Sequence, residues 1–145
     1  MELTLLTYAG LLAIAFASAT ILPLQSEALL AALLVARRDP VALVLVATVG
    51  NVAGSTVNWW LGRRLAALRR PGWLRISDAS LQRAGERYRR YGKWSLLLSW
   101  VPVIGDPLTL MAGFLNERLT TFLMLVTIAK SVRYVLVTLI VLGLL

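Results

Sequence analysis

The sequence predicts an all-α integral membrane protein with two re-entrant helical hairpins and two full transmembrane helices in an inverted repeat, plus an amphipathic interfacial helix. Composition supports this class, because 59% of the 145 residues are apolar, 15% are charged and the mean hydropathy is +0.76. Soluble domains are nearer half apolar and a quarter charged. Long apolar stretches and a repeat between the two halves of the chain complete the argument.

The first apolar region covers residues 3–36 and is interrupted by Pro23 and Glu27. Between Glu27 and Arg37, too few residues remain to cross a hydrocarbon layer of about 30 Å at about 1.5 Å per residue. A chain that enters the membrane, breaks near Pro23 and leaves on the same side fits better. We therefore expect a re-entrant hairpin here.

A first full span is expected at residues 41–61, because Asp39 and Pro40 supply a helix start just before it. Gly50 and Gly54 are four residues apart, and this spacing of small residues lets another helix approach closely. Polar side chains near that face can hydrogen-bond to the neighbouring helix: Asn51, Ser55 and Asn58.

Basic residues gather in the segment that follows this span. Ten of the fifteen Lys and Arg residues lie between Arg63 and Lys93. Such clustering is typical of a cytoplasmic loop under the positive-inside rule. We therefore expect residues 62–64 to end the span on the cytoplasmic side, and we expect no nucleic-acid partner.

The basic segment also contains a predicted amphipathic helix. Ser77 is suited to cap it, and Leu81, Ala84, Tyr88 and Tyr91 form an apolar stripe at helical spacing. One interpretation places this helix in the membrane interface with its arginines toward lipid headgroups. The alternative is a helix packed against protein with solvated arginines. The residues concerned are Arg83, Arg87, Arg89 and Arg90.

Residues 94–115 form a second apolar stretch whose centre, "VPVIGDP", contains Pro102, Asp106 and Pro107. This stretch is too short for two crossings, so it predicts a second hairpin that enters from the cytoplasmic side. A short polar turn then leads into a second full span at residues 119–142.

A shift of 79 residues aligns the two halves, placing Pro23 on Pro102 and Glu27 on Asp106. Because one crossing separates the halves, their hairpins enter from opposite sides of the membrane. Many transporters are built from such inverted repeats, with broken segments meeting near the midplane. We expect one membrane domain, residues 1–145, with repeats at 3–64 and 94–145 and a basic linker at 65–93.

Four ionisable residues fall inside the predicted membrane segments. Glu27 and Asp106 lie in the hairpins, Lys130 lies near the middle of the second span, and Arg133 shares its helix face. Intramembrane ionisable groups are functional candidates by default. The alternative is structural, with Glu27–Arg133 and Asp106–Lys130 pairs that hold the helices together, or cations that extend to the interface.

The chain contains no Cys and no His. Disulfides and thiolate chemistry are therefore excluded, and the commonest metal ligand and general base are missing. We expect no metal, no cofactor and no enzymatic activity.

Several motifs, taken together, resemble the DedA (SNARE-associated, VTT-domain) superfamily, and the short bacterial YqaA-like members in particular. Glu27 and Asp39 match the family's glutamate and the acid twelve residues later. The string "GNVAGSTVNWWLGR" matches the family's G-x-x-x-G-x-x-x-x-Y-x-x-G-R pattern, with Trp59 in place of the tyrosine. "YRRYG" and "MAGF" flank the second hairpin as the family's corresponding elements do.

One departure concerns the second hairpin. Typical members carry R-F-x-P-x-x-R there, whereas this chain has "SWVPVIG", with Ser99 and Gly105 at the arginine positions and Pro102 retained. The typical mechanism therefore does not transfer directly. Asp106, Lys130 and Arg133 are candidates to compensate.

The resemblance implies the movement of lipids across a bilayer, and several bacterial members are linked to the proton-motive force. We expect a transporter or scramblase for a lipid with an anionic phosphate headgroup, in which Lys130 and Arg133 meet the phosphate. Glu27 and Asp106 would exchange protons, and Asp39 would lie near the outer mouth. Residues expected to form the pocket and its hinges are Pro23, Gly50, Asn51, Gly54, Asn58, Ser99, Pro102, Gly105 and Pro107.

Two alternatives stay open. The first is a proton- or cation-coupled transporter of a small soluble solute, which would need a homo-oligomer and could use the Gly50 and Gly54 face as a contact. The second is a structural or assembly factor that transports nothing. In every case we expect a multi-pass protein of the bacterial inner membrane, with residues 63–93 in the cytoplasm and with membrane lipids, and protons, as partners.

Overall fold

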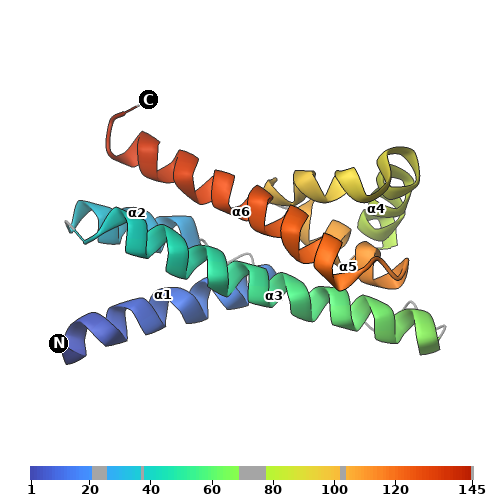
Figure 1. Ribbon diagram of the computed structural model, residues 1–145, viewed down its shortest axis with the longest axis horizontal. Coiled ribbons are helices and arrows are strands. Elements are labelled where there is room, and N and C mark those ends of the chain that lie inside the picture. The colour runs from blue at the N-terminus through green and yellow to red at the C-terminus, as the bar shows by residue number, and fades with distance from the viewer. Residues whose placement is uncertain (21–25, 37, 69–77, 102–103, 145) are drawn as a thin grey trace.

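All regular structure in the described part of the chain is helical, which confirms the all-α prediction. The computed structural model describes residues 1–20, 26–36, 38–68, 78–101 and 104–144 (Figure 1). The helices are α1 (Glu2–Thr20), α2 (Ser26–Val35), α3 (Pro40–Leu68), α4 (Asp78–Tyr91), the 3₁₀ helix η2 (Gly92–Trp100), α5 (Gly105–Phe114) and α6 (Leu119–Val141).

Three of the described helices, α1, α3 and α6, are long and apolar enough to cross a membrane. α3 and α6 correspond to the two predicted full spans. α1 has 19 residues, so at about 1.5 Å per residue it can reach across most of a hydrocarbon layer. The re-entrant form of the first hairpin stays a prediction.

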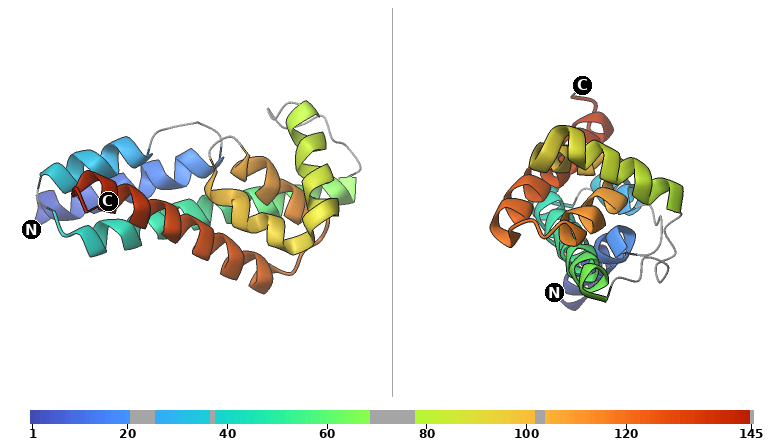
Figure 2. Two further views of the ribbon diagram at one scale, coloured as in Figure 1. Left: turned by 90° about the horizontal axis from the view of Figure 1, so that it is seen from above. Right: turned by 90° about the vertical axis from the view of Figure 1, so that its right-hand side faces the viewer.

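The two hairpins lie at opposite ends of the molecule and point toward each other. α1 and α2 extend from the end that holds both chain termini to the centre, while η2 and α5 extend from the other end to the centre (Figures 1 and 2). Pro23 and Pro102, predicted as the breaks of the two hairpins, lie outside the described residues. Pro107 lies in the first turn of α5, where a helix tolerates proline because that turn lacks an internal acceptor for its N–H.

The two hairpins pack in corresponding ways against α3 and α6. α1 packs against α3 and η2 packs against α6, each within its own half of the sequence. The second limbs cross over, so that α5 packs along α3 and α2 packs along α6. Each long helix therefore supports one limb from each hairpin.

The glycines of α3 have their predicted effect, and the neighbour that they admit is α1. A Cβ added at Gly50 would lie 2.5 Å from the carbonyl oxygen of Leu12, and one added at Gly54 would lie 2.7 Å from the Cβ of Ala19. The backbones of α1 and α3 therefore touch. Because this face is covered within one chain, a contact between copies would need another surface.

α5 approaches the other end of α3 in the same way. Gly113 of α5 lies against the backbone of Trp59, and Gly62 of α3 lies against the backbone of Leu110. Trp59 also belongs to an apolar core with Phe122 of α6. A second core, nearer the chain termini, joins α1 and α2 to the first half of α3 and the second half of α6.

The helix that holds the first predicted span continues beyond residues 62–64, where the span was expected to end. α3 continues to Leu68, since arginine is a good helix former and interrupts only the apolar character. The guanidinium of Arg63 lies 4.9 Å from the ring centre of Trp59, and that of Arg64 lies 5.0 Å from the ring centre of Trp60.

α4 packs against α5 and η2, which favours the alternative of a protein-packed helix on its inner side. Ala84 and Tyr88 of the predicted stripe are buried, but Tyr91 is 52% exposed, so the stripe does not extend to it. The helix ends at Tyr91, and Gly92 with its positive φ of 60° changes the chain direction there. Arg87 is partly buried, and three arginines are exposed: Arg83, Arg89 and Arg90.

We expect Gly113→Val to lower the free energy of unfolding by about 2 kcal/mol or more, because the new side chain meets the backbone of Trp59 and forces α3 and α5 apart. Thermal or denaturant unfolding in detergent measures this. Gly10→Ala is the matched control, since no described atom lies within 4 Å of a Cβ placed there, and alanine favours the helix by up to about 1 kcal/mol. Equal losses in both variants would contradict the packing.

Candidate functional site

The candidate site forms where the two hairpins meet the middle of α6. Glu27 lies in the first turn of α2, and Asp106 lies in the first turn of α5. A carboxylate is favoured at a helix N-terminus because the backbone amides there carry partial positive charge. Lys130 and Arg133 lie on α6, three residues apart and so on one face. The structure thus brings these four predicted residues together.

Glu27 and Arg133 form a direct ion pair between α2 and α6. The Glu27 side chain is 25% exposed and the Arg133 side chain is 19% exposed, so both charged groups are mostly covered by the protein. Separating such a pair leaves each charge uncompensated, which costs several kcal/mol when the groups are buried. This pair therefore holds the first hairpin onto α6.

Lys130 and Asp106 form a looser pair. The Lys130 Nζ lies 3.9 Å from the Asp106 Oδ1, which is a Coulombic contact too long for a hydrogen bond. Lys130 is only 2% exposed, whereas Asp106 is 38% exposed. The ammonium group is thus enclosed by protein while its carboxylate partner can reach the surroundings.

Tyr134 connects the first hairpin to both long helices. Its hydroxyl lies 2.9 Å from the Ser26 Oγ and accepts a 2.9 Å hydrogen bond from the Asn51 Nδ2. Asn51 also donates to the Ser18 Oγ at 3.1 Å. This network joins α1, α2, α3 and α6 directly beside Glu27. The sequence offered one signal for Tyr134, its position four residues after Lys130 on the same helix face.

Asn58 makes the corresponding connection to the second hairpin. It donates to the carbonyl oxygen of Ala19 at 2.6 Å and to the Thr109 Oγ1 at 3.3 Å. Thr109 in turn donates to the carbonyl oxygen of Asp106 at 2.8 Å. Of the three residues predicted to hydrogen-bond across the α3 face, Asn51 and Asn58 do so. Ser55 has no hydrogen-bond partner among the described residues.

Asp39 is not part of this cluster. Its carboxylate caps α3, accepting a 3.0 Å hydrogen bond from the Val41 amide in an exposed position. It lies at the end of the molecule that holds the termini, whereas α4 and its arginines lie at the opposite end (Figure 1). A role for Asp39 at one mouth of a pathway stays a prediction.

Position 105 explains how this chain departs from the arginine-containing pattern. Gly105 lies so close to the backbone of Ser99 that a Cβ at this position would collide with it. An arginine could not be accommodated here without moving η2 away from α5. Ser99 itself is buried.

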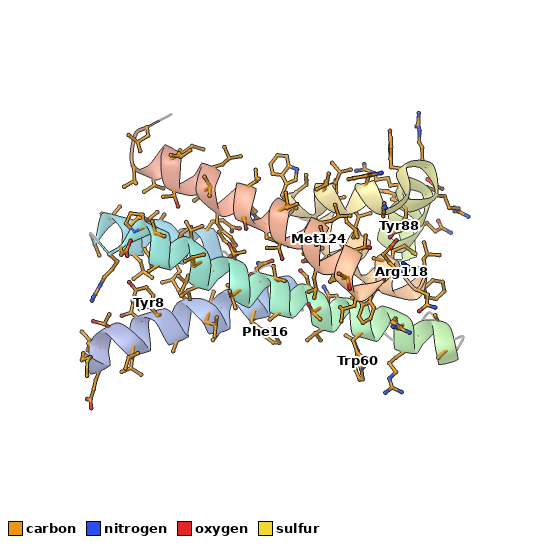
Figure 3. All side chains as sticks on the ribbon, in the orientation of Figure 1. Tyr8, Phe16, Trp60, Tyr88, Arg118 and Met124 are labelled. Carbon is orange, nitrogen blue, oxygen red and sulfur yellow. The ribbon has the colours of Figure 1, made fainter. Side chains whose placement is uncertain are left out.

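Glu117, which the sequence did not single out, fastens α4 to the turn before α6. The Tyr88 hydroxyl donates to the Glu117 Oε2 at 2.5 Å, and the Trp59 Nε1 donates to the Glu117 carbonyl oxygen at 3.1 Å. Burial, together with the hydrogen bond and negative charge of Glu117, raises the pKa of Tyr88, so the phenol stays protonated. Figure 3 shows Tyr88 at the same end of the molecule as Arg118, next to this turn.

Comparison with known proteins places the chain in a family. A family model described as the VTT domain matches residues 22–142. The chain belongs to the VTT-domain family. The resemblance inferred from Glu27, Asp39 and the glycine-rich string is thereby confirmed. Both hairpin acids and both α6 cations fall inside the matched VTT domain. Within the described ranges, no three His, Cys, Asp or Glu residues group as a metal site would require.

The relatives support the same assignment. Inner membrane protein YqaA of Escherichia coli (strain K12) is 38% identical over 129 residues, which cover 88% of this chain and 86% of the relative. YqaA of Shigella flexneri gives the same values. An uncharacterized protein of Haemophilus influenzae is 38% identical over 132 residues, covering 83% of this chain and 78% of the relative. No solved structure matches the chain.

We expect Tyr134→Phe to lower the free energy of unfolding by about 1–3 kcal/mol, because Asn51 and Ser26 both lose a buried hydrogen-bond partner. Unfolding monitored by tryptophan fluorescence in detergent measures this. The control is Tyr8→Phe on α1, where the phenol packs at the edge of the core near the termini. A Tyr134→Phe variant as stable as the control would show that the network contributes nothing.

Proposed function

We propose that this protein moves a lipid with an anionic phosphate headgroup across the inner membrane, without chemical change to the lipid. The observation that carries the proposal is the meeting of Glu27, Asp106, Lys130 and Arg133 at the centre of a strongly apolar helical bundle. Ionisable groups at membrane depth are costly, and they mark substrate or proton pathways more often than they serve packing alone.

The physical task in lipid translocation is to carry a polar headgroup through the apolar layer while the acyl chains remain in lipid. A cluster of charges between helices lowers that cost by replacing the headgroup's water with fixed polar partners. The first turns of α2 and α5 both face this centre, and helix N-termini favour anionic groups. Lys130 of α6, which has only a loose contact with Asp106, supplies the opposite charge for a phosphate.

The carboxylates provide a route for coupling to protons. Asp106 is the more exposed member of its pair, so a proton can reach it more readily than it can reach Glu27. Protonation would release Lys130 from its partner, and a change in the charge of one partner shifts the equilibrium between states of the site. A proton gradient could thereby give the movement a direction.

The basic end of the molecule is proposed to face the cytoplasm. Arg83, Arg89 and Arg90 are exposed on α4, and the positive-inside rule places such clusters on the cytoplasmic side. Each basic residue near an anionic leaflet contributes roughly 1 kcal/mol of attraction. The names of the YqaA relatives support an inner-membrane location for the protein as a whole.

We expect the purified protein to accelerate transbilayer movement of a fluorescently labelled phospholipid in liposomes, measured by chemical quenching of the outer leaflet. Glu27→Gln and Lys130→Gln should slow this rate about tenfold or more, because each removes a charged partner worth about 1.5–3 kcal/mol. Glu2→Gln and Lys93→Gln, which neutralise exposed charges far from the site, are the matched controls.

Rates unchanged in Glu27→Gln and Lys130→Gln would remove this mechanism. Solute-dependent proton uptake without lipid movement would instead favour a transporter of small soluble molecules.

Orientation has its own test, since the chain contains no Cys. Ala36 and Glu86 are both exposed and lie near opposite ends of the molecule. In intact inner-membrane spheroplasts, a membrane-impermeant thiol reagent should label Ala36→Cys but not Glu86→Cys. Inverted vesicles should give the reverse. Labelling of Glu86→Cys from outside would overturn the proposed orientation.

A further inference from the structure

Lys130 carries an ammonium group whose hydrogen-bonding capacity is largely unused. The side chain is 2% exposed, and across the described residues the structure gives it no polar partner closer than Asp106 at 3.9 Å. An ammonium has three donors. Burying it without a hydrogen bond is costly, so this position is suited to receive an acceptor from outside the protein.

Ser55 is a second unused polar group on the same level of the molecule. It is fully buried on α3, and its Oγ has no hydrogen-bond partner in the described structure. Ser55 lies one turn beyond Asn51, and Lys130 lies one turn before Tyr134. α3 and α6 run in opposite directions (Figure 1). Ser55 and Lys130 are therefore both displaced by about 6 Å, in the same direction along the bundle, from the hydrogen bond between Asn51 and Tyr134.

The next turn of α3 confirms this register from the other side. Asn58 follows Ser55 and donates to Thr109, which in turn donates to the carbonyl oxygen of Asp106. Ser55 thus lies between a residue that contacts Tyr134 and a residue that contacts the first turn of α5. On α6, Lys130 lies one turn before Tyr134 and contacts Asp106, so Ser55 and Lys130 lie at the same level of the bundle.

We propose that Lys130 and Ser55 form an oxyanion-binding pair in this chain, and that Asp106 is an internal competitor which the bound phosphate displaces from Lys130. This inference rests on the proposed function and specifies its binding site. The phosphate oxygens would accept from the ammonium and from the serine hydroxyl. Asp106 is the partly exposed member of its pair. By taking up a proton it can leave Lys130 without becoming an unpaired charge when the anion binds.

Arg133 does not share this role. Its guanidinium is held in a direct pair with Glu27, and that carboxylate lies beside the network of Ser26 and Tyr134. Displacing Glu27 would therefore remove the ion pair that joins α2 to α6. The two cations of α6 thus have different tasks, since Arg133 holds the first hairpin in place and Lys130 binds the substrate.

The donor set also selects the class of ligand. An ammonium and a hydroxyl both donate to oxygen, whereas a metal cation at this position would be repelled by Lys130. The Asn51 Oδ1, buried without a partner among the described residues, lies one turn away and can accept the proton of a phosphate monoanion. A phosphate monoester or a free phosphate fits this combination.

The test is ligand binding by the full chain in a detergent without phosphate, measured as the rise of the unfolding midpoint with ligand concentration. The probes are dioctanoyl phosphatidic acid, inorganic phosphate and, as the uncharged control, dioctanoylglycerol. Lys130→Gln should weaken phosphate binding about tenfold or more, and Ser55→Ala should weaken it about three- to tenfold. Asp106→Asn should strengthen binding, because the competitor is removed.

Three variants serve as controls. Thr138→Val removes a buried hydroxyl on α6 that, like the hydroxyl of Ser55 on α3, has no partner in the described ranges. This variant should bind phosphate as the wild type does. Lys130→Arg keeps the positive charge and should retain most of the affinity. A wild-type midpoint without ligand in Ser55→Ala would show that the loss of binding does not come from a loss of folding.

Equal binding by the wild type, Lys130→Gln and Ser55→Ala would overturn the inference, and so would an Asp106→Asn variant that binds as weakly as Lys130→Gln. The expected order of variants with phosphatidic acid alone identifies a lipid headgroup, and the same order with inorganic phosphate identifies the free anion. If this order holds but liposomes show no lipid movement, the proposed function fails and the oxyanion site stands. If liposomes show lipid movement but the variants do not bind in this order, the proposed function stands and the oxyanion site fails.

Discussion

The apolar layer accepts a charge inside it only where an opposite charge or a hydrogen bond accompanies that charge. This constraint links the fold to the site, because α6 carries two cations on one face and each takes its acid from a different hairpin. The first turns of α2 and α5 must therefore both end beside the middle of α6. Removing either hairpin would leave a cation of α6 without its partner.

Close backbone contacts on α3 supply the complementary constraint. Small residues at two levels of this helix admit α1 on one side and α5 on the other, so that main chains rather than side chains touch. Such contacts have little freedom to adjust, because no flexible group lies between the two backbones. The compliant part of the structure is consequently the contact between Asp106 and Lys130, which is long and has one partly exposed partner.

Much of this arrangement could be predicted from the sequence, because each apolar stretch, its length and its charged interruptions carry direct physical meaning in a membrane protein. The helical class, the two predicted full spans in α3 and α6, the broken segments and the four ionisable residues follow from such features, whereas the family follows from the resemblance of its motifs. The pairs Glu27–Arg133 and Asp106–Lys130 were named from the sequence only as a structural alternative, and both are present. The sequence could not choose this pairing, since Lys130 and Arg133 share one face and only the packing of α2 and α5 separates them. Tyr134 gave little signal, because a hydroxyl in an apolar helix becomes meaningful only when Ser26 and Asn51 converge on it. The helix continues past residues 62–64, where the span was expected to end, since a change from apolar to basic composition marks the edge of a membrane and not the end of a helix.

The bond between Tyr88 and Glu117 connects the surface of the molecule to its interior. Glu117 precedes α6 directly and also accepts from Trp59 through its carbonyl oxygen, so α4, α3 and the start of α6 meet at one residue. α4 carries exposed arginines, and in the proposed orientation they would respond to the charge of the adjacent leaflet. A sideways displacement of α4 must either break this bond or drag the first turn of α6 with it. In the proposed orientation, a change in the lipid composition of the surrounding leaflet would therefore shift α4 and, through Glu117, the helix that carries Lys130.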